Sequence, residues 1–337
     1  MTPSELVKSL ALSSGFDLVG IAKAEVIPEA QEHYFQWLEK GYHADMQWME
    51  KDPERRSDPQ KVVEGAKSII MLAINYYQED PKFPEGSGRI ARYARGKDYH
   101  KYLEKMLKSF VQKLKEQVSA TDEYRYYVDY GPFLERAYAE MSGIGFIGRN
   151  KMLITREFGS YVFLSEVITT LELTPDKPQP RLCGTCRACI DACPTKAIVE
   201  KQVSGKWSVD CGSSNTMSPQ TTDHRLQTSI DSRRCLPFHT IESKRESIPD
   251  EIVSKMGDRI FGCDICQEVC PHNIVNAKPT KHTVFTENST AFVSASSFLK
   301  MTEEEFKEKF TGTALMRTGL KGMQRNSEAM QKNIAIE

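Results

Sequence analysis

The residues with the clearest chemistry are cysteines, and all nine lie between Cys183 and Cys270. Residues 183–194 read CGTCRACIDACP, which is the C-x2-C-x2-C-x3-C-P spacing of bacterial two-cluster ferredoxins. Residues 263–271, CDICQEVCP, repeat the x2 and x3 spacings and the proline. Two such runs predict two 4Fe–4S clusters and one-electron redox chemistry.

The second run lacks one upstream cysteine, and Cys235 is its natural substitute. In two-cluster ferredoxins the last cysteine of a run ligates the other cluster. This crossed pattern predicts Cys183, Cys186, Cys189 and Cys270 as ligands of one cluster, and Cys193, Cys235, Cys263 and Cys266 as ligands of the other. Cys211 is left over.

Zinc and disulfides are the alternatives for these cysteines. Paired C-x2-C motifs also occur in zinc ribbons, but the four-cysteine run ending in proline is more specific and favours clusters. Disulfides require an oxidising compartment. The N-terminus shows no basic and then apolar leader, and no run approaches about 20 apolar residues. We therefore predict a cytoplasmic protein with no membrane span.

Overall charge identifies no partner. Lys and Arg number 45 against 46 Asp and Glu, so the composition alone predicts neither a nucleic acid, a membrane surface nor an acidic ligand. The 337 residues suffice for roughly two domains. Because clusters move electrons but do not by themselves transform an organic substrate, the rest of the chain must hold a substrate or another cofactor.

The elements that would position this chemistry indicate an α/β (α+β) fold. Apolar runs at 17–22 and 68–75 predict strands covered on both faces, and residues 99–117 predict an amphipathic helix. A proline-rich stretch after Leu173 precedes the cysteines. We expect a front domain at 1–175, a ferredoxin-like domain at 176–280 with a polar insertion at 201–227, and a helical segment at 281–337 that packs back on the core.

Some front-domain residues have more than one interpretation. Residues 143–148 spell G-x-G-x-x-G, but they follow a helical pattern and lead into a strand, which favours a glycine-rich helix exit approached by a flat cofactor over a dinucleotide site. Asp129 lies at the end of an apolar strand, just before a helix. It is either the N-cap of that helix or, if burial raises its pKa, a proton donor. Arg56 and the arginines of 92–95 are either solvated or hold phosphate or carboxamide groups.

Several long motifs, in order along the chain, resemble those of the epoxyqueuosine reductases. They are RYARGKDYH at 92–100, VD-x-x-P-x-x-E at 128–135, GIGFIGRN at 143–150, EFGS at 157–160, the four-cysteine run, RC at 234–235 with TIE at 240–242, and RIFGCDICQEVCP at 259–271. The resemblance extends over nearly the whole chain.

This resemblance implies a cobalamin-dependent oxidoreductase that reduces the epoxide of epoxyqueuosine, at the wobble position of tRNA, to queuosine. Its two clusters would relay electrons from an external donor to a corrinoid in the front domain, whose fold would resemble that of reductive dehalogenases. The family's proton donor falls on Asp129. Arg56, Asp129, Asn150 and Ser160 lie in segments that resemble the corrinoid-contacting regions. The expected partner is tRNA carrying epoxyqueuosine, and the expected state is a monomer.

The chain also departs from the family pattern. Residues 236–242 read LPFHTIE where many relatives have SYLTIE, a change expected near the cofactor or substrate mouth, with His239 as a substrate-side candidate or a packed residue. The helical repeats that help longer members hold tRNA are absent from this sequence. A corrinoid iron–sulfur reductase of another small molecule therefore stays open as an alternative. A plain ferredoxin-type electron carrier is the third hypothesis, but it gives the front domain no function.

Overall fold

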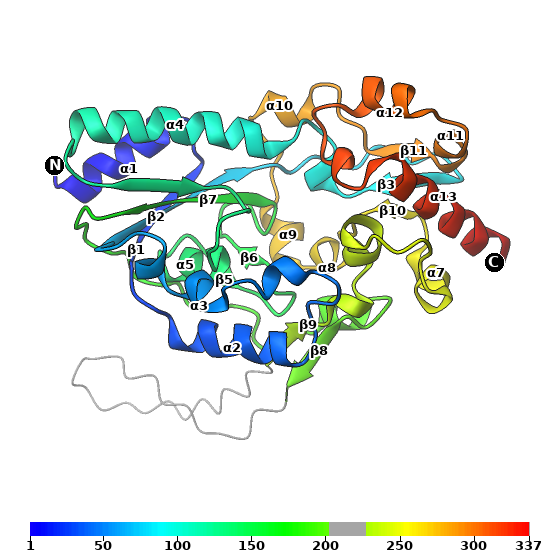
Figure 1. Ribbon diagram of the computed structural model, residues 1–337, viewed down its shortest axis with the longest axis horizontal. Coiled ribbons are helices and arrows are strands. Elements are labelled where there is room, and N and C mark those ends of the chain that lie inside the picture. The colour runs from blue at the N-terminus through cyan, green and yellow to red at the C-terminus, as the bar shows by residue number, and fades with distance from the viewer. Residues whose placement is uncertain (202–226, 337) are drawn as a thin grey trace.

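The front part of the protein is built on an antiparallel sheet (Figure 1). The computed structural model describes residues 1–201 and 227–336, so Cys211 and nearly all of the predicted insertion lie outside the described residues. The strand order is β1 (Leu18–Lys23), β2 (Ser68–Asn75), β7 (Val162–Thr169) and β4 (Tyr124–Tyr127), and each neighbouring pair is antiparallel. All eight residues of β2 are buried, which confirms a strand covered on both faces.

Helices cover both faces of this sheet (Figure 1). On one face lie α1 (Pro3–Ser13) and α4 (Tyr99–Gln117), whose apolar stripe packs on Ile70, Leu72 and Ile74 of β2. The other face carries α5 (Glu135–Met141), with α2 (Pro28–Glu39) and α3 (Pro53–Ser57) beyond it. The side chains of β2 alternate between two apolar cores because successive residues of a strand point to opposite faces.

A second, three-stranded sheet joins distant stretches of the chain. Its central strand is β3 (Ser87–Ile90), which pairs in parallel with β10 (Arg259–Phe261) and antiparallel with β11 (Phe292–Ser294). A further apolar core surrounds it, built from α7 (Asp250–Met256), α11 (Ala295–Leu299), α12 (Glu303–Phe310) and α13 (Gly319–Ile336). The tail therefore packs back on the cysteine-bearing part of the chain, as the sequence predicts.

The cysteine region consists of short elements held against the front part. They are the hairpins β5 (Phe146–Ile147) with β6 (Leu153–Ile154) and β8 (Ile198–Lys201) with β9 (Gln227–Ile230), and the helices α6 (Ala188–Ala192), α8 (Ile265–Glu268), α9 (Pro271–Asn276) and α10 (Thr283–Thr286). The indole of Trp37 in α2 donates to the Ile230 carbonyl at 2.7 Å, which ties β9 to the front part. Among the described helices, none has both the length and the apolar character needed to cross a bilayer.

Candidate active site and cluster centre

The structure brings the eight predicted cluster cysteines together from separate segments. Cys183 and Cys186 precede α6, Cys189 lies in it and Cys193 ends it, whereas Cys235 follows a turn at 232–234 and Cys263, Cys266 and Cys270 surround α8. Helices α6 and α8 are in contact. All eight are free thiols, so no disulfide links the described cysteines.

The electrostatic neighbours of most of these thiols follow the crossed pattern, whereas Cys266 lies within range of Cys189 of the other set as well as of Cys263 and Cys235. Burial, and then the thiols of Cys183, Cys270 and Cys186, raises the pKa of Cys189 to about 11. Burial, and then Cys263 and Cys193, raises the pKa of Cys235 to about 12. Neighbouring thiols raise one another's pKa because each thiolate repels the next. They lose their protons together when a cationic metal centre binds among them, as cluster ligands do. Within residues 1–201 and 227–336, no three Cys, His, Asp or Glu side chains are arranged for a single metal ion.

The surroundings of the thiols fit iron–sulfur clusters. The sulfur of Cys193 accepts the backbone N–H of Ala197 at 3.2 Å, and N–H···S bonds of this kind stabilise the charge on a cluster. Cys270 is buried with Phe146 and Ile154, whose apolar side chains limit the access of water to its thiol. Burial and hydrogen bonding are the means by which a protein tunes a cluster.

Asn150 and Ser160 attach the cysteine helices to the front sheet. The buried amide of Asn150 donates to the Cys266 carbonyl at 3.1 Å. The hydroxyl of Ser160 donates to Gln267 at 3.0 Å, and its backbone N–H donates to the Asn273 side chain at 2.6 Å. Both side chains thus have protein partners and fix α8 and α9 in place. Their assignment as corrinoid contacts stays a prediction.

Asp129 lies in the loop between β4 and α5. Because α5 begins at Glu135 and its N-cap is Leu134, the N-cap interpretation of Asp129 is wrong. Its backbone has a left-handed φ of 60°, and its N–H donates to Glu135 Oε1 at 2.7 Å. The side chain is 62% exposed. Its carboxylate accepts the Tyr99 hydroxyl at 2.9 Å and lies 3.5 Å from His100 Nε2.

The proton of this site rests on His100. Burial acts to raise the pKa of Asp129, but hydrogen bonds from His100 and Tyr99 and the charges of His100 and Arg317 lower it overall. Burial acts to lower the pKa of His100, but the carboxylates of Asp129 and Asp98 raise it to about 9. The ring nitrogen Nδ1 of His100 lies 2.6 Å from Asp98 Oδ1. At neutral pH His100 is therefore an imidazolium and Asp129 a carboxylate. The prediction that burial raises the pKa of Asp129, so that it carries the proton itself, is wrong.

Two acids lie next to this loop, Glu166, which is buried, and Glu135, which is half-buried. Glu166 of β7 is fully buried, and neither of its carboxyl oxygens has a hydrogen-bond partner. Burial, and then the charge of Glu135, raises the pKa of Glu166 well above its usual value. Burial and the charge of Asp129 raise the pKa of Glu135 to about 7. A carboxyl so deeply buried without a partner is neutral, because ionising it would cost several kcal/mol.

Arg56 contacts the loop that carries Asp129. Its guanidinium donates to the Gly131 carbonyl at 3.1 Å. Its Nε is buried without a hydrogen-bond partner. An unpaired guanidinium donor at this position fits the carboxamide or phosphate acceptors that a corrinoid carries.

The glycine-rich segment has a structural explanation. It follows α5, as predicted, and Gly143 leaves the helix with φ of 73°. A side chain at Gly145 would lie 2.6 Å from the Ile154 carbonyl, and one at Gly148 would lie 2.5 Å from the Ile154 side chain. These glycines let the β5–β6 hairpin close on itself. The approach of a flat cofactor to this segment stays a prediction.

The unusual residues at 236–239 lie inside the protein. Leu236, Phe238 and His239 are all buried, and His239 Nε2 lies 2.8 Å from the Arg233 carbonyl. The histidine is thus a packed, hydrogen-bonded residue. The changed residues pack in the core, and a place near the cofactor or substrate mouth stays a prediction.

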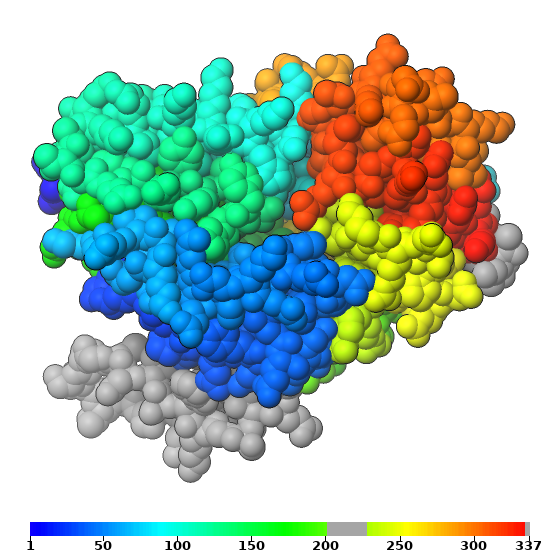
Figure 2. All heavy atoms as spheres, in the orientation of Figure 1, coloured from blue at the N-terminus to red at the C-terminus, as the bar shows by residue number. Residues whose placement is uncertain are grey.

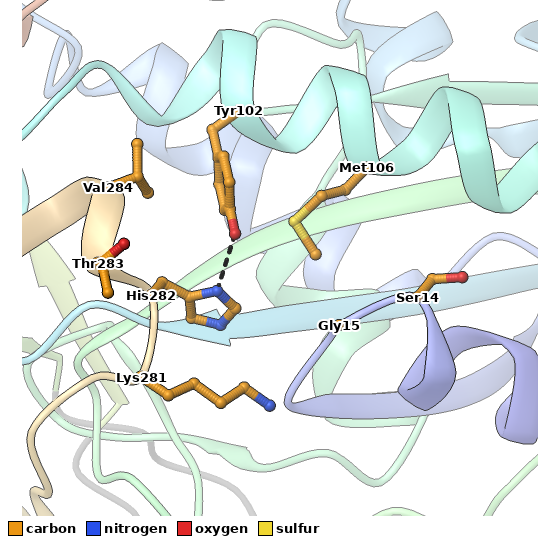
Figure 3. A pocket seen from close by; sticks show the side chains of 8 residues that line it. All are labelled: Ser14, Gly15, Tyr102, Met106, Lys281, His282, Thr283 and Val284. Atoms are coloured by element: carbon orange, nitrogen blue, oxygen red, sulfur yellow. Dashed lines mark hydrogen bonds between the residues drawn. The ribbon is translucent and has the colours of Figure 1, made fainter.

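A cavity of about 380 Å³ lies between α4 and residues 281–284 and includes no residue of the Asp129 loop (Figure 3). In it His282 bridges the Tyr102 hydroxyl, at 3.1 Å, and the Asp17 carboxylate, at 2.9 Å. Lys281 pairs with the other oxygen of Asp17 at 2.7 Å. These polar groups satisfy one another and attach residues 281–284 to the front sheet.

Tyr99 and His100 contact Asp129, and the sequence assigned neither of them a role. Both belong to the motif at 92–100, which is the signal that pointed to this segment. Their side chains meet Asp129 only because the first turn of α4 folds against the loop after β4. Figure 2 shows a hollowed surface where the blue and green front part faces the yellow and orange residues of the cysteine region and tail.

Known families match both parts of the chain. The family "Epoxyqueuosine reductase QueG, DUF1730" matches residues 56–130, and "4Fe-4S double cluster binding domain" matches residues 182–273. The epoxyqueuosine reductase of Cyclobacterium marinum is 38% identical over 325 residues, which cover 96% of this chain and 95% of that protein. The one from Gloeobacter violaceus is 36% identical over 331 residues, with 96% and 94% covered.

Solved structures show the same fold. The epoxyqueuosine reductase of Streptococcus thermophilus matches with a TM-score of 0.81 at 29% identity, over 99% of this chain and 82% of that one. An epoxyqueuosine reductase crystallised with an epoxyqueuosine-modified tRNA-Tyr stem loop matches with a TM-score of 0.82 at 30% identity, over 98% and 82%. The Bacillus subtilis enzyme, with its catalytic aspartate loop swung out of the active site, matches with a TM-score of 0.81 at 29% identity, over 98% and 82%.

The expected likeness to reductive dehalogenases is slight. The dehalogenase NpRdhA matches at 13% identity with a TM-score of 0.45, which is too low to support a conclusion about chemistry. The full-length relatives, the two family matches and the fold agree with one another. The chain belongs to the epoxyqueuosine reductase family of oxidoreductases.

Proposed function

We propose that this protein reduces the epoxide of epoxyqueuosine, at the wobble position of tRNA, to the alkene of queuosine. The observation that carries the proposal is the combination, in one chain, of eight cysteines in two sets and a carboxylate–imidazolium pair at Asp129 and His100. The related structure that holds a modified tRNA-Tyr stem loop supports tRNA as the partner.

The clusters supply the electrons. Conversion of the epoxide to the alkene releases the oxygen as water and consumes two electrons and two protons. In this proposal Cys183, Cys186, Cys189 and Cys270 hold one cluster, and Cys193, Cys235, Cys263 and Cys266 hold the other. Each cluster passes one electron at a time from an external donor toward the front part of the chain.

Cobalamin is the second cofactor of the proposal. When bound, it supplies the two-electron chemistry at the substrate that clusters alone lack. Arg56 would hold an acceptor group of the corrinoid through its unpaired Nε, beside the Asp129 loop. Asn150 and Ser160 would support the site by keeping the cysteine helices against the front sheet.

Asp129 supplies the proton to the departing oxygen. In the resting enzyme the proton lies on His100, which Asp98 orients through its other ring nitrogen. Transfer from His100 to the Asp129 carboxylate makes the acid, and Tyr99 holds that carboxylate in position. Proton donation by a positioned side chain contributes about 10²–10⁴-fold in rate.

The test begins with the cofactors. Anaerobically purified protein should contain about eight irons per chain and, after cobalamin is added, show the absorption spectrum of a bound corrinoid. Clusters without corrinoid binding would instead support a plain electron carrier. With a strong reductant and tRNA carrying epoxyqueuosine, the loaded enzyme should then form queuosine.

A variant series tests the acid. Asp129→Ala should lower turnover by at least about 100-fold while iron content and corrinoid binding stay unchanged. Asp122→Ala is the matched control, because this aspartate lies just before the same strand and contacts Ser119 and Thr170 instead. Full activity in Asp129→Ala would refute the acid role.

A further inference from the structure

An exposed indole lies under an arginine near the Asp129 site. Trp48, in the short turn Gln47–Met49, is 40% exposed. The guanidinium of Arg317, from the turn Ala314–Arg317, lies 5.6 Å from the centre of its ring. The two residues come from opposite ends of the chain and form a stacked cation–π pair. A large aromatic side chain that stays this open at a junction is available for a ligand.

Arg317 is held in a fixed orientation. Its Nε and a terminal nitrogen donate to both carboxylate oxygens of Glu242, at 2.8 and 2.7 Å. This bidentate pair uses the Nε–Nη2 edge of the guanidinium and fixes the orientation of its plane. The side chain nevertheless remains 57% exposed, and what it presents is a flat face. Glu242, Arg317 and Trp48 together form a rigid, planar and half-open surface.

This surface lies within electrostatic range of Asp129. Against the effect of burial, and after His100 and Tyr99, the charge of Arg317 helps to lower the pKa of Asp129. Charges at a protein surface interact appreciably only within about 10 Å at ordinary salt. Beyond Asp129, the exposed ring of Tyr130 stacks on His100 with 5.6 Å between ring centres. Planar side chains therefore lie at two places around Asp129, one formed by Trp48 and Arg317 and the other by Tyr130.

We propose that Trp48 and Arg317 form a stacking platform for the base of an unpaired tRNA nucleotide beside the modified one. This proposal rests on the proposed function, which supplies tRNA as the partner. Proteins that bind single-stranded RNA stack unpaired bases on aromatic rings and guanidinium planes. A phosphate contact through the Nη1 side of the guanidinium is the competing role for Arg317, and the salt dependence of binding distinguishes the two roles.

The test measures RNA affinity in the loaded enzyme. The probe is an anticodon stem loop carrying epoxyqueuosine, and its dissociation constant is followed by fluorescence anisotropy over a range of salt. Trp48→Leu, which keeps an apolar side chain but no ring, should weaken binding about tenfold, and Trp48→Phe should weaken it much less. Phe35→Leu is the matched control, because Phe35 is exposed to a similar degree, 37%, on α2. Its affinity should equal that of the wild type.

The salt series separates stacking from charge. Since no phosphate contact is lost, the slope of log affinity against log salt should be the same in Trp48→Leu and wild type. An unchanged dissociation constant, a flatter slope, or an equal loss of affinity for duplex RNA would overturn the platform. Iron content and melting temperature show that the variant is folded.

The outcomes also separate this proposal from the proposed function. If the wild type binds the stem loop in a Trp48-dependent way but forms no queuosine, the platform stands and the proposed reaction fails. If the wild type forms queuosine while Trp48→Leu binds normally, the platform alone fails. Failure of the wild type to bind the stem loop would overturn the platform.

Discussion

The proton held between His100 and Asp129 can be measured without substrate. Burial acts to lower the pKa of His100, whereas Asp129 and Asp98 raise it from 6.5 to about 9. Asp129→Asn removes one of the two carboxylates and keeps the shape of the side chain. Hydrogen bonds to charged groups contribute about 1.5–3 kcal/mol when buried, and solvent at the exposed Asp129 reduces this to about 1–1.5 kcal/mol. The pKa of His100 should therefore fall by about one unit.

The same pair makes the stability of the protein depend on pH. The pKa of His100 is higher in the folded than in the unfolded chain, so its contribution is fully present below about pH 6.5 and is lost as the pH rises through about 9. In that window the free energy of unfolding should fall with a slope of at most about 1.4 kcal/mol per pH unit. Asp129→Asn should make this fall shallower.

Histidine-selective NMR of the holoprotein is the direct assay, with the signal assigned by its loss in His100→Gln. Urea unfolding at pH 6, 7.5 and 9 supplies the free energies. A His100 pKa near 6.5 in the wild type, or the same pKa in wild type and Asp129→Asn, would refute the reasoning. Turnover of the wild type should also decline as the pH rises through about 9, because His100 then loses the proton that Asp129 delivers.

Three further predictions concern the supporting residues. Cys235→Ala should lower the iron content from about eight to about four per chain, whereas Cys211→Ala should keep about eight; equal iron loss in both would contradict the ligand sets. Glu166→Gln should raise the free energy of unfolding at pH 8 by about 1 kcal/mol and change it little at pH 4, because the folded state raises the pKa of this acid and keeping it protonated costs more, relative to the ionised unfolded chain, as the pH rises. No gain at pH 8 would show that Glu166 is not strained there. Ser160→Ala removes the hydroxyl contacts to Gln267 and Asn273 and should cost about 1–2 kcal/mol in urea unfolding, and an unchanged midpoint would argue against their role in joining the two parts.

Local patterns predicted the features that depend on local spacing. The cysteine runs predicted that thiols from separate segments gather in one region, whereas their division into two ligand sets stays a prediction. The helix at 99–117 and the buried strand at 68–75 appear with the predicted bounds, since their apolar periodicity is strong. The helix before the glycine-rich segment was also predicted, although it is shorter than its pattern suggested.

Features that depend on distant contacts could not be predicted in this way. Asp129 lacks the capping role that its position suggested, because its partners come from α4, some 30 residues earlier. The motif at 143–148 suggested approach by a cofactor, but the sequence did not reveal that Gly145 and Gly148 are required by the close approach of Ile154. The contact of Trp48 with Arg317 joins residues that no motif connects. In each case a side chain's role is decided by a neighbour that sequence spacing does not reveal.

The three-stranded sheet has a consequence for how the protein is made on the ribosome. Strand β3 is synthesised early, but both of its neighbours, β10 and β11, emerge some 170 to 200 residues later. Until then its backbone groups lack their sheet partners, and contacts so distant in sequence form slowly. The last of these strands, β11, follows every cysteine-bearing element along the chain, so the sheet can be completed only after all the cysteines have been translated.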